Sequence, residues 1–155
     1  AELWLDGYNI LNALEAALSG GVILLGRDGC CRDMAGTHGG YRPVVETMPS
    51  LRLLGETLAE WQVATCHWWL DSPVSNSGRL KHVLLDLAAR MGWPWQVDLV
   101  FSPDKVLSES AHIVATSDSV ILDRCERWVS LSRHIVDLKI PQARVVNLSC
   151  TTPAP

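Results

Sequence analysis

The chain has 155 residues, of which 48% are hydrophobic, and a formal net charge of −4 at pH 7. This length suits one domain with a hydrophobic core and is too short for two comfortable ones. The charge argues against a broad basic surface that would coat nucleic acid, but it allows a local site where cations neutralise clustered carboxylates. No apolar run reaches the roughly 18 residues that span a bilayer, and no signal peptide opens the sequence. We therefore expect a cytoplasmic protein.

Strand and helix signals alternate from the start of the chain. In chain order, the apolar patterns of the first part predict a strand, a helix, a strand, a loop and a helix at residues 2–5, 8–19, 22–25, 26–43 and 45–62. Gly20 and Gly21 end the first of these helices. The loop is rich in glycine and charge and has no periodicity, so we expect it to have little regular structure and to lie over or beside the functional site.

The second part continues this alternation. It predicts a strand, a helix, two strands, a helix and two late strands at residues 64–70, 79–91, 95–101, 112–116, 118–130, 134–138 ("HIVDL") and 144–148 ("RVVNL"). Strands that alternate with helices indicate βαβ units, and therefore an α/β fold with a mainly parallel sheet and helices on both faces. The chain does not begin with Met and enters its first strand at once, so we expect residues 1–155 to be a single domain excised from a longer protein.

Three aspartates follow apolar strands at the point where the chain turns into a helix. They are Asp6 in "LDGYN", Asp71 in "LDSPVSNSG" and Asp118 in "ATSDS". The carboxyl ends of parallel strands share one edge of the sheet, where α/β proteins bind ligands. Converging carboxylates would repel one another, and Mg²⁺ or Mn²⁺ would relieve that repulsion. Each aspartate also has a simpler interpretation, as a helix N-cap at 6 and 118 and as a turn residue at 71.

These motifs, in this order, resemble the PIN-like nucleases, specifically the NYN branch, and within that superfamily an uncharacterised bacterial and archaeal family of unknown function. The similarity runs over essentially the whole chain and includes the "RDG…RDMAG…HGGYR" loop. The resemblance implies a PIN-like three-layer α/β/α domain with a central parallel sheet and a divalent-metal site for phosphodiester hydrolysis.

Position by position, the resemblance implies a set of site residues. Asp6, Asp71 and Asp118 match the metal-ligating acids, and Asn9 matches the asparagine that follows the first of them. Asp123 is a further outer-sphere acid in this interpretation, or else pairs with Arg127 four residues on. PIN-like proteins carry another acid on a helix, for which the candidates here are Glu15 and Glu46.

Other residues are candidates for substrate contacts. Ser75, Ser77 and Gly78 precede a helix whose free N–H groups could hold a phosphate, with Arg79 and Lys81 beside them; the alternative is a serine-capped helix. Ser117 stands in the late "SD" motif. The charged residues of the 26–43 loop either gate the site or pair among themselves on the surface: Arg27, Asp28, Arg32, Asp33 and Arg42. The seven tryptophans invite a base-stacking interpretation, but strand positions favour core packing.

The chain contains five cysteines and no C-x-x-C pair. Cys30 and Cys31 are adjacent, which disfavours an ordinary disulfide between them. A zinc site would need His38 as a partner. Reduced structural thiols are the simpler interpretation, and they suit the cytoplasm.

The sequence therefore favours a Mg²⁺- or Mn²⁺-dependent endonuclease that acts on RNA. One alternative is a non-catalytic relative that serves as a scaffold or RNA-binding module. Another is a phosphatase or nucleotide hydrolase that uses the same carboxylates. The absence of a wide basic face favours either a small substrate or a second copy of the chain or protein partner that supplies affinity for RNA.

Overall fold

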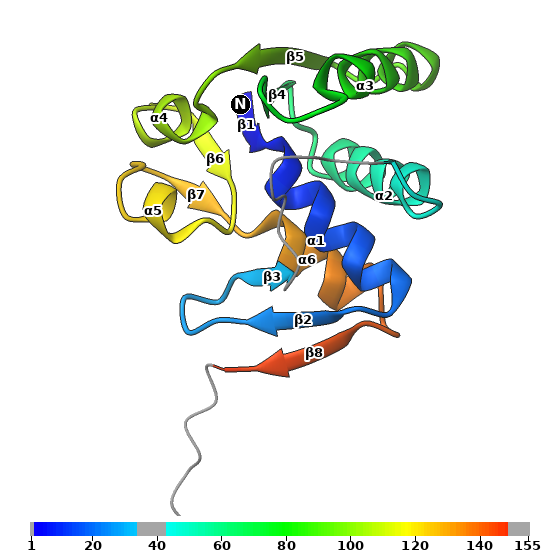
Figure 1. Ribbon diagram of the computed structural model, residues 1–155, viewed down its shortest axis with the longest axis vertical. Helices are drawn as coiled ribbons and strands as arrows, with labels where there is room; N and C mark the ends of the chain where they lie inside the picture. Colours follow the sequence, from blue (N-terminus) through cyan, green and yellow to red (C-terminus); the bar gives the residue numbers. More distant parts are fainter. Residues whose placement is uncertain (1, 34–42, 149–155) are drawn as a thin grey trace, which may run out of the picture.

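The computed structural model describes residues 2–33 and 43–148. Within these residues the secondary-structure elements are, in chain order, β1 (Glu2–Asp6), α1 (Gly7–Ser19), β2 (Val22–Leu25), β3 (Cys31–Asp33), α2 (Thr47–Glu60), β4 (Thr65–Asp71), α3 (Ser77–Met91), β5 (Trp95–Val100), α4 (Pro103–Ser108), β6 (Ile113–Ala115), α5 (Ser119–Leu122), β7 (Trp128–Val129), α6 (Leu131–Lys139) and β8 (Arg144–Asn147). Figure 1 shows their arrangement.

A central five-stranded sheet carries the fold, in the order β5-β4-β1-β6-β7. Every neighbouring pair of strands in it is parallel. All five carboxyl ends therefore lie at one edge, and the helices or loops that follow the strands begin there. The predicted α/β class with a parallel central sheet is confirmed.

The two faces of this sheet are covered by different helices. Along β1, Leu3 and Leu5 are buried in the main core, which also contains side chains of α1, α2, α3 and α6. Trp4 belongs to the opposite face, because successive side chains of a strand alternate. There it packs with Leu107 of α4 and Ile121 of α5. The helices on both sides of the sheet make three α/β/α layers.

A second, three-stranded sheet packs on the other side of α1, in the order β3-β2-β8. β3 runs antiparallel to β2, whereas β8 runs parallel to it. Ile23 and Leu25 of β2 enter the main core, and α1 contacts β2 and β3 as well as the central sheet. In Figure 1 this sheet lies at the bottom of the molecule, below α1.

The structure corrects two predicted elements. "HIVDL", predicted as a strand, lies in α6, where Leu131, Ile135 and Val136 are buried. A short apolar run does not distinguish a strand from a helix by itself, and packing against α1 and α2 decides in favour of the helix. The helix predicted at 118–130 ends at Leu122, and Trp128 and Val129 instead pair with β6.

Two short elements were not predicted. β3 interrupts the segment 26–43, and α4 occupies the stretch after β5. Residues 34–42 of the segment, with His38 and Arg42, lie outside the described residues. In the part of the chain that the structure describes, no helix is long and apolar enough to cross a membrane.

Candidate functional site

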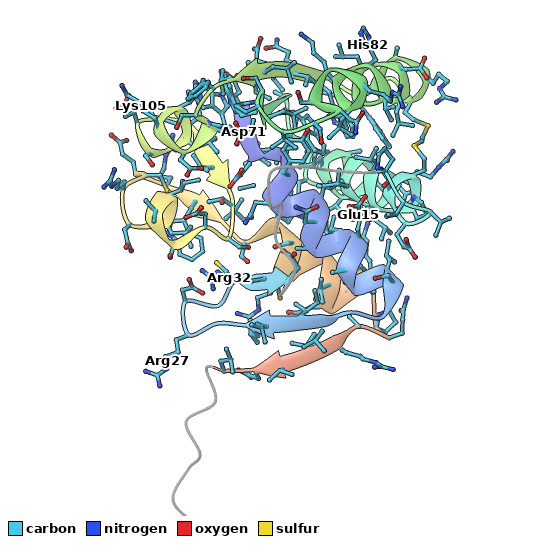
Figure 2. All side chains as sticks on the ribbon, viewed as in Figure 1. Glu15, Arg27, Arg32, Asp71, His82 and Lys105 are labelled. Atoms are coloured by element: carbon cyan, nitrogen blue, oxygen red, sulfur yellow. The ribbon has the colours of Figure 1, made fainter. Side chains whose placement is uncertain are left out.

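A pocket of about 260 Å³ opens at the carboxyl edge of the central sheet. Five aspartates line it, and among the described lining residues there is no lysine, arginine or histidine. The lining residues are Asp6, Tyr8, Asn9, Asn12, Asp33, Trp69, Asp71, Val74, Pro103, Asp104 and Asp118. Asp71, at the end of β4, is labelled in Figure 2. The pocket thus combines oxygen ligands with a surplus of negative charge.

Asp6 is the last residue of β1 and is only 9% exposed. Its carboxylate does not cap α1. Instead, Oδ2 accepts a hydrogen bond of 2.7 Å from the Thr116 hydroxyl. The backbone N–H of Asp118 donates to the same Thr116 oxygen, at 3.0 Å. Thr116 therefore links the first acid of the pocket to the segment that carries the third.

Gly7 lets α1 begin directly beside the sheet. A Cβ atom at this position would lie 2.5 Å from Leu70 Cδ2 and 3.2 Å from the backbone oxygen of Trp69. A side chain would therefore push the start of α1 away from β4. The glycine after Asp6 allows the close approach that brings the ends of β1 and β4 into one pocket.

Burial raises the pKa values of three of the pocket acids, and neighbouring negative charges add to the shift in two of them. The pKa of Asp6 is about 7, chiefly because burial disfavours its charged form, and the charges of Asp104, Asp118 and Asp71 add to this. Burial also raises the pKa of Asp71. The pKa of Asp104 is raised by desolvation and by the charges of Asp118 and Asp71. The charges of Asp71 and Asp118 thus act on both Asp6 and Asp104.

Asp71 and Asp118 use their carboxylates differently. Oδ1 of Asp71 is buried and has no hydrogen-bond partner among the described residues. Beside it, burial and the charge of Asp71 raise the pKa of Tyr8 to about 12, so Tyr8 stays protonated. Asp118 Oδ1 accepts the N–H of Val120 at 2.8 Å, which makes Asp118 the N-cap of α5. The cap interpretation is thus confirmed for Asp118, which also lines the pocket.

Asn9, Ser117 and Arg32 hold the loop after β6 in place. Asn9 Oδ1 accepts the backbone N–H of Ser117 at 2.8 Å. Arg32 Nε donates to the Ser117 carbonyl at 2.7 Å, and Arg32 also forms an ion pair with Asp28. The Ser117 hydroxyl lies 3.2 Å from that of Ser132 in α6. Asn9 also lines the pocket, whereas Ser117 and Arg32 do not and act only on the loop that leads to Asp118.

Several predicted site residues do not line the pocket. Ser75 and Arg79 are exposed on the turn into α3 and at its start. The Ser77 hydroxyl donates to the Ser72 carbonyl instead of capping α3, whose N-cap is Asn76.

The remaining predicted acids also lie elsewhere. Asp123 is exposed at the end of α5, and its predicted partner Arg127 donates to the Ala111 carbonyl. Glu15 is buried and accepts a hydrogen bond from Thr47. Glu46 is the residue before α2. None of the three lines the pocket.

Asp104, Asn12 and the role of Thr116 were not predicted from the sequence, and Asp33 was predicted only as part of a charged loop. Asp104 had a usable signal, because "FSPD" follows a predicted strand just as the other acids do. Its Pro103 stands at the first position of a helix, where proline is favoured. Asp33 reaches the pocket at the end of β3. No spacing in the sequence indicates that contact, because β3 belongs to the other sheet.

The described residues contain no preformed metal site. No group of three or more His, Cys, Asp or Glu side chains in residues 2–33 and 43–148 is arranged to hold an ion. The pocket acids nevertheless offer hard oxygen donors of the kind that Mg²⁺ and Mn²⁺ prefer. Cys30, Cys31 and Cys66 are buried free thiols, and burial raises the pKa of each. The zinc alternative depends on His38, which is not described.

The fold and the pocket together define an α/β protein with a parallel central sheet and a carboxylate-rich pocket at the ends of its strands. Residues 1–134 match the family described as a domain of unknown function (DUF5616), and the chain belongs to this family. An uncharacterized protein of Methanocaldococcus jannaschii is 32% identical over 120 residues, which cover 77% of this chain and 57% of that protein. The chain thus spans little more than half the length of this relative. No solved structure matches this chain.

Proposed function

We propose that the protein is a PIN-like, Mg²⁺- or Mn²⁺-dependent phosphodiesterase that cleaves RNA in the reducing cytoplasm. The observation that carries this proposal is the set of aspartates that successive segments bring to one pocket at the carboxyl edge of a parallel sheet. A surplus of carboxylates without a lysine or arginine suits a cation far better than it suits a bare phosphate.

Asp6, Asp71, Asp104 and Asp118 are the residues that would hold the metal. The unpartnered buried oxygen of Asp71 and the desolvated carboxylate of Asp6 suit this role, because each is costly without a counter-charge. A bound divalent ion would activate water and stabilise charge on the phosphoryl oxygens. Thr116 orients Asp6 through its hydroxyl, and Asn9 holds the segment that carries Asp118.

A second candidate is a non-catalytic scaffold or RNA-binding module of the same fold. The absence of a preassembled group of three ligands in the described part of the chain favours it. The two candidates differ in their response to metal, because a scaffold has no use for an ion in the pocket.

Replacing Asp6 with Asn distinguishes the candidates. Asn keeps an oxygen that accepts from Thr116 but removes one negative charge. In the metal-dependent enzyme, millimolar Mn²⁺ should raise the Tm of the parent protein, since saturation at 100 times Kd contributes about 2.7 kcal/mol. Asp6→Asn should lose most of this rise and all Mn²⁺-dependent cleavage of a single-stranded RNA.

Asp86→Asn is the matched control, because Asp86 is exposed on α3 and pairs with Arg90 away from the pocket. It should behave like the parent in both assays. A parent protein whose Tm is unchanged by Mn²⁺ and that cleaves no RNA would favour the scaffold.

A further inference from the structure

A second groove adjoins the acidic pocket on the far side of α4. It has a volume of about 470 Å³ and runs between α4 and α5. Asp104 lines both cavities, so the first turn of α4 is the wall that they share. A ligand long enough to pass Asp104 would contact both cavities.

The groove has two cationic side chains, which the acidic pocket lacks. Lys105 of α4 and Arg124, just after α5, both line it. Neither side chain forms an ion pair or a side-chain hydrogen bond with another described residue, whereas Arg32, Arg90, Arg133 and Lys139 are each paired with an acid. Asp104 and Glu109 also border the groove. Figure 2 shows Lys105 projecting from α4.

We propose that this groove binds a phosphate that neighbours the scissile one in an RNA strand, with Lys105 and Arg124 as its cationic partners. The proposal rests on the proposed function and specifies its substrate. Cations that have no protein partner can neutralise a phosphate without breaking an existing ion pair. Two adjoining cavities, one acidic and one with cations, suit a strand with several phosphodiesters, whereas a small phosphomonoester would fill the first alone.

The test compares two double variants of equal charge change. K105Q/R124Q removes both cations of the groove. R52Q/R144Q removes two exposed arginines of α2 and β8 that line neither cavity. Each pair is combined with Asp6→Asn so that the strand is not cut. Fluorescence anisotropy then measures the binding of a labelled ten-residue oligouridylate in Mn²⁺.

The groove variant should bind the oligouridylate about tenfold more weakly than its parent, as expected for two exposed ion pairs. The slope of log K against log salt should shrink by about 1.4, since each contact to a single strand contributes about 0.7. The control pair should change neither quantity. Binding of a dinucleoside monophosphate, which has a single phosphodiester, should be equal in all proteins.

Equal weakening by both double variants would overturn the proposal, because it would show only an effect of net charge. Unchanged binding by K105Q/R124Q would overturn it as well. Failure of the proposed function is a different result. It would appear in the protein without substitutions, as a Tm that does not respond to Mn²⁺ and as absence of RNA cleavage.

Discussion

Asp6 occupies a position where a carboxylate is costly. It is buried at the end of the first strand and shares its pocket with further acids. The Thr116 hydroxyl donates one hydrogen bond to it, but burial outweighs this bond, and the pKa is about 7. At neutral pH and without a cation, Asp6 is therefore a source of instability in the folded protein.

This residue makes stability depend on pH in a definite direction. The folded-state pKa of about 7 exceeds the value of about 3.9 of an unfolded aspartate. Between these values the folded chain binds more protons, so this contribution to the free energy of unfolding falls as pH rises and is lost by about pH 7. In EDTA, the parent protein should lose up to about 4 kcal/mol between pH 4 and pH 8 through Asp6.

Asp6→Asn should remove most of this pH dependence and should be the more stable protein at pH 8. Urea unfolding at pH 5 and pH 8, with Asp86→Asn as the control, measures the effect. Parallel pH dependence in all three proteins would contradict it and would mean that Asp6 is ionised at little cost.

At the scale of the element, the start of α1 controls the geometry of the site. Gly7 lies against β4, and two residues later Asn9 holds the backbone of Ser117. One helical turn therefore positions β1, β4 and the loop after β6 relative to one another. In the order Asp-Gly-Tyr-Asn, the aspartate supplies a pocket carboxylate, the glycine lets the helix start close to β4, and the asparagine binds the backbone of Ser117.

Gly7→Ala should lower the free energy of unfolding by about 1–3 kcal/mol, because the added methyl group would overlap Leu70. Alanine favours helices, so a loss measured by chemical denaturation must come from this overlap. Gly7→Ala should also reduce the Tm increase caused by Mn²⁺, because it would displace Asp6.

Gly78→Ala is the control for that substitution. It lies in the first turn of α3, and nothing is within 4 Å of an added Cβ. This variant should be as stable as the parent or slightly more stable. Equal stability of Gly7→Ala and Gly78→Ala would show that the start of α1 moves freely.

At the scale of the whole molecule, α1 joins two sheets of different construction. Four of the pocket acids lie at the ends of strands of the central parallel sheet or in the segments that follow those strands. The fifth, Asp33, comes from β3 of the second sheet. Arg32 strengthens this connection through its bond to the Ser117 carbonyl. The edge strand β8 is different, because all four of its residues are exposed.

A protein that ends at Ala143, and so lacks β8, should still fold cooperatively and keep the pocket. We expect a loss of about 1–3 kcal/mol from the missing strand pairing, with an unchanged Tm increase in Mn²⁺. Thermal unfolding of the 155-residue protein and of the shortened protein, each with and without Mn²⁺, tests this. Loss of the Mn²⁺ response in a folded short protein would show that β8 supports the site.

Local sequence patterns predicted the class of the fold and three of the acids that line the pocket. Periodicity separated most strands from helices, and strand-end acids identified Asp6, Asp71 and Asp118. These inferences succeed because a parallel sheet brings the carboxyl ends of its strands to one edge whatever the details of packing. Both signals are local, so they can be read from consecutive residues.

The tertiary structure, in contrast, selects the other residues that line the pocket. Asp104 and Asp33 line the pocket, whereas Asp123 and the Ser75–Arg79 turn do not. It also decided that the run from His134 to Leu138 is helical. These outcomes depend on which surfaces meet, such as α4 against the ends of β1 and β4. Contacts between residues far apart in the chain leave no periodic signal in a single sequence, because they arise from packing that local propensity does not encode.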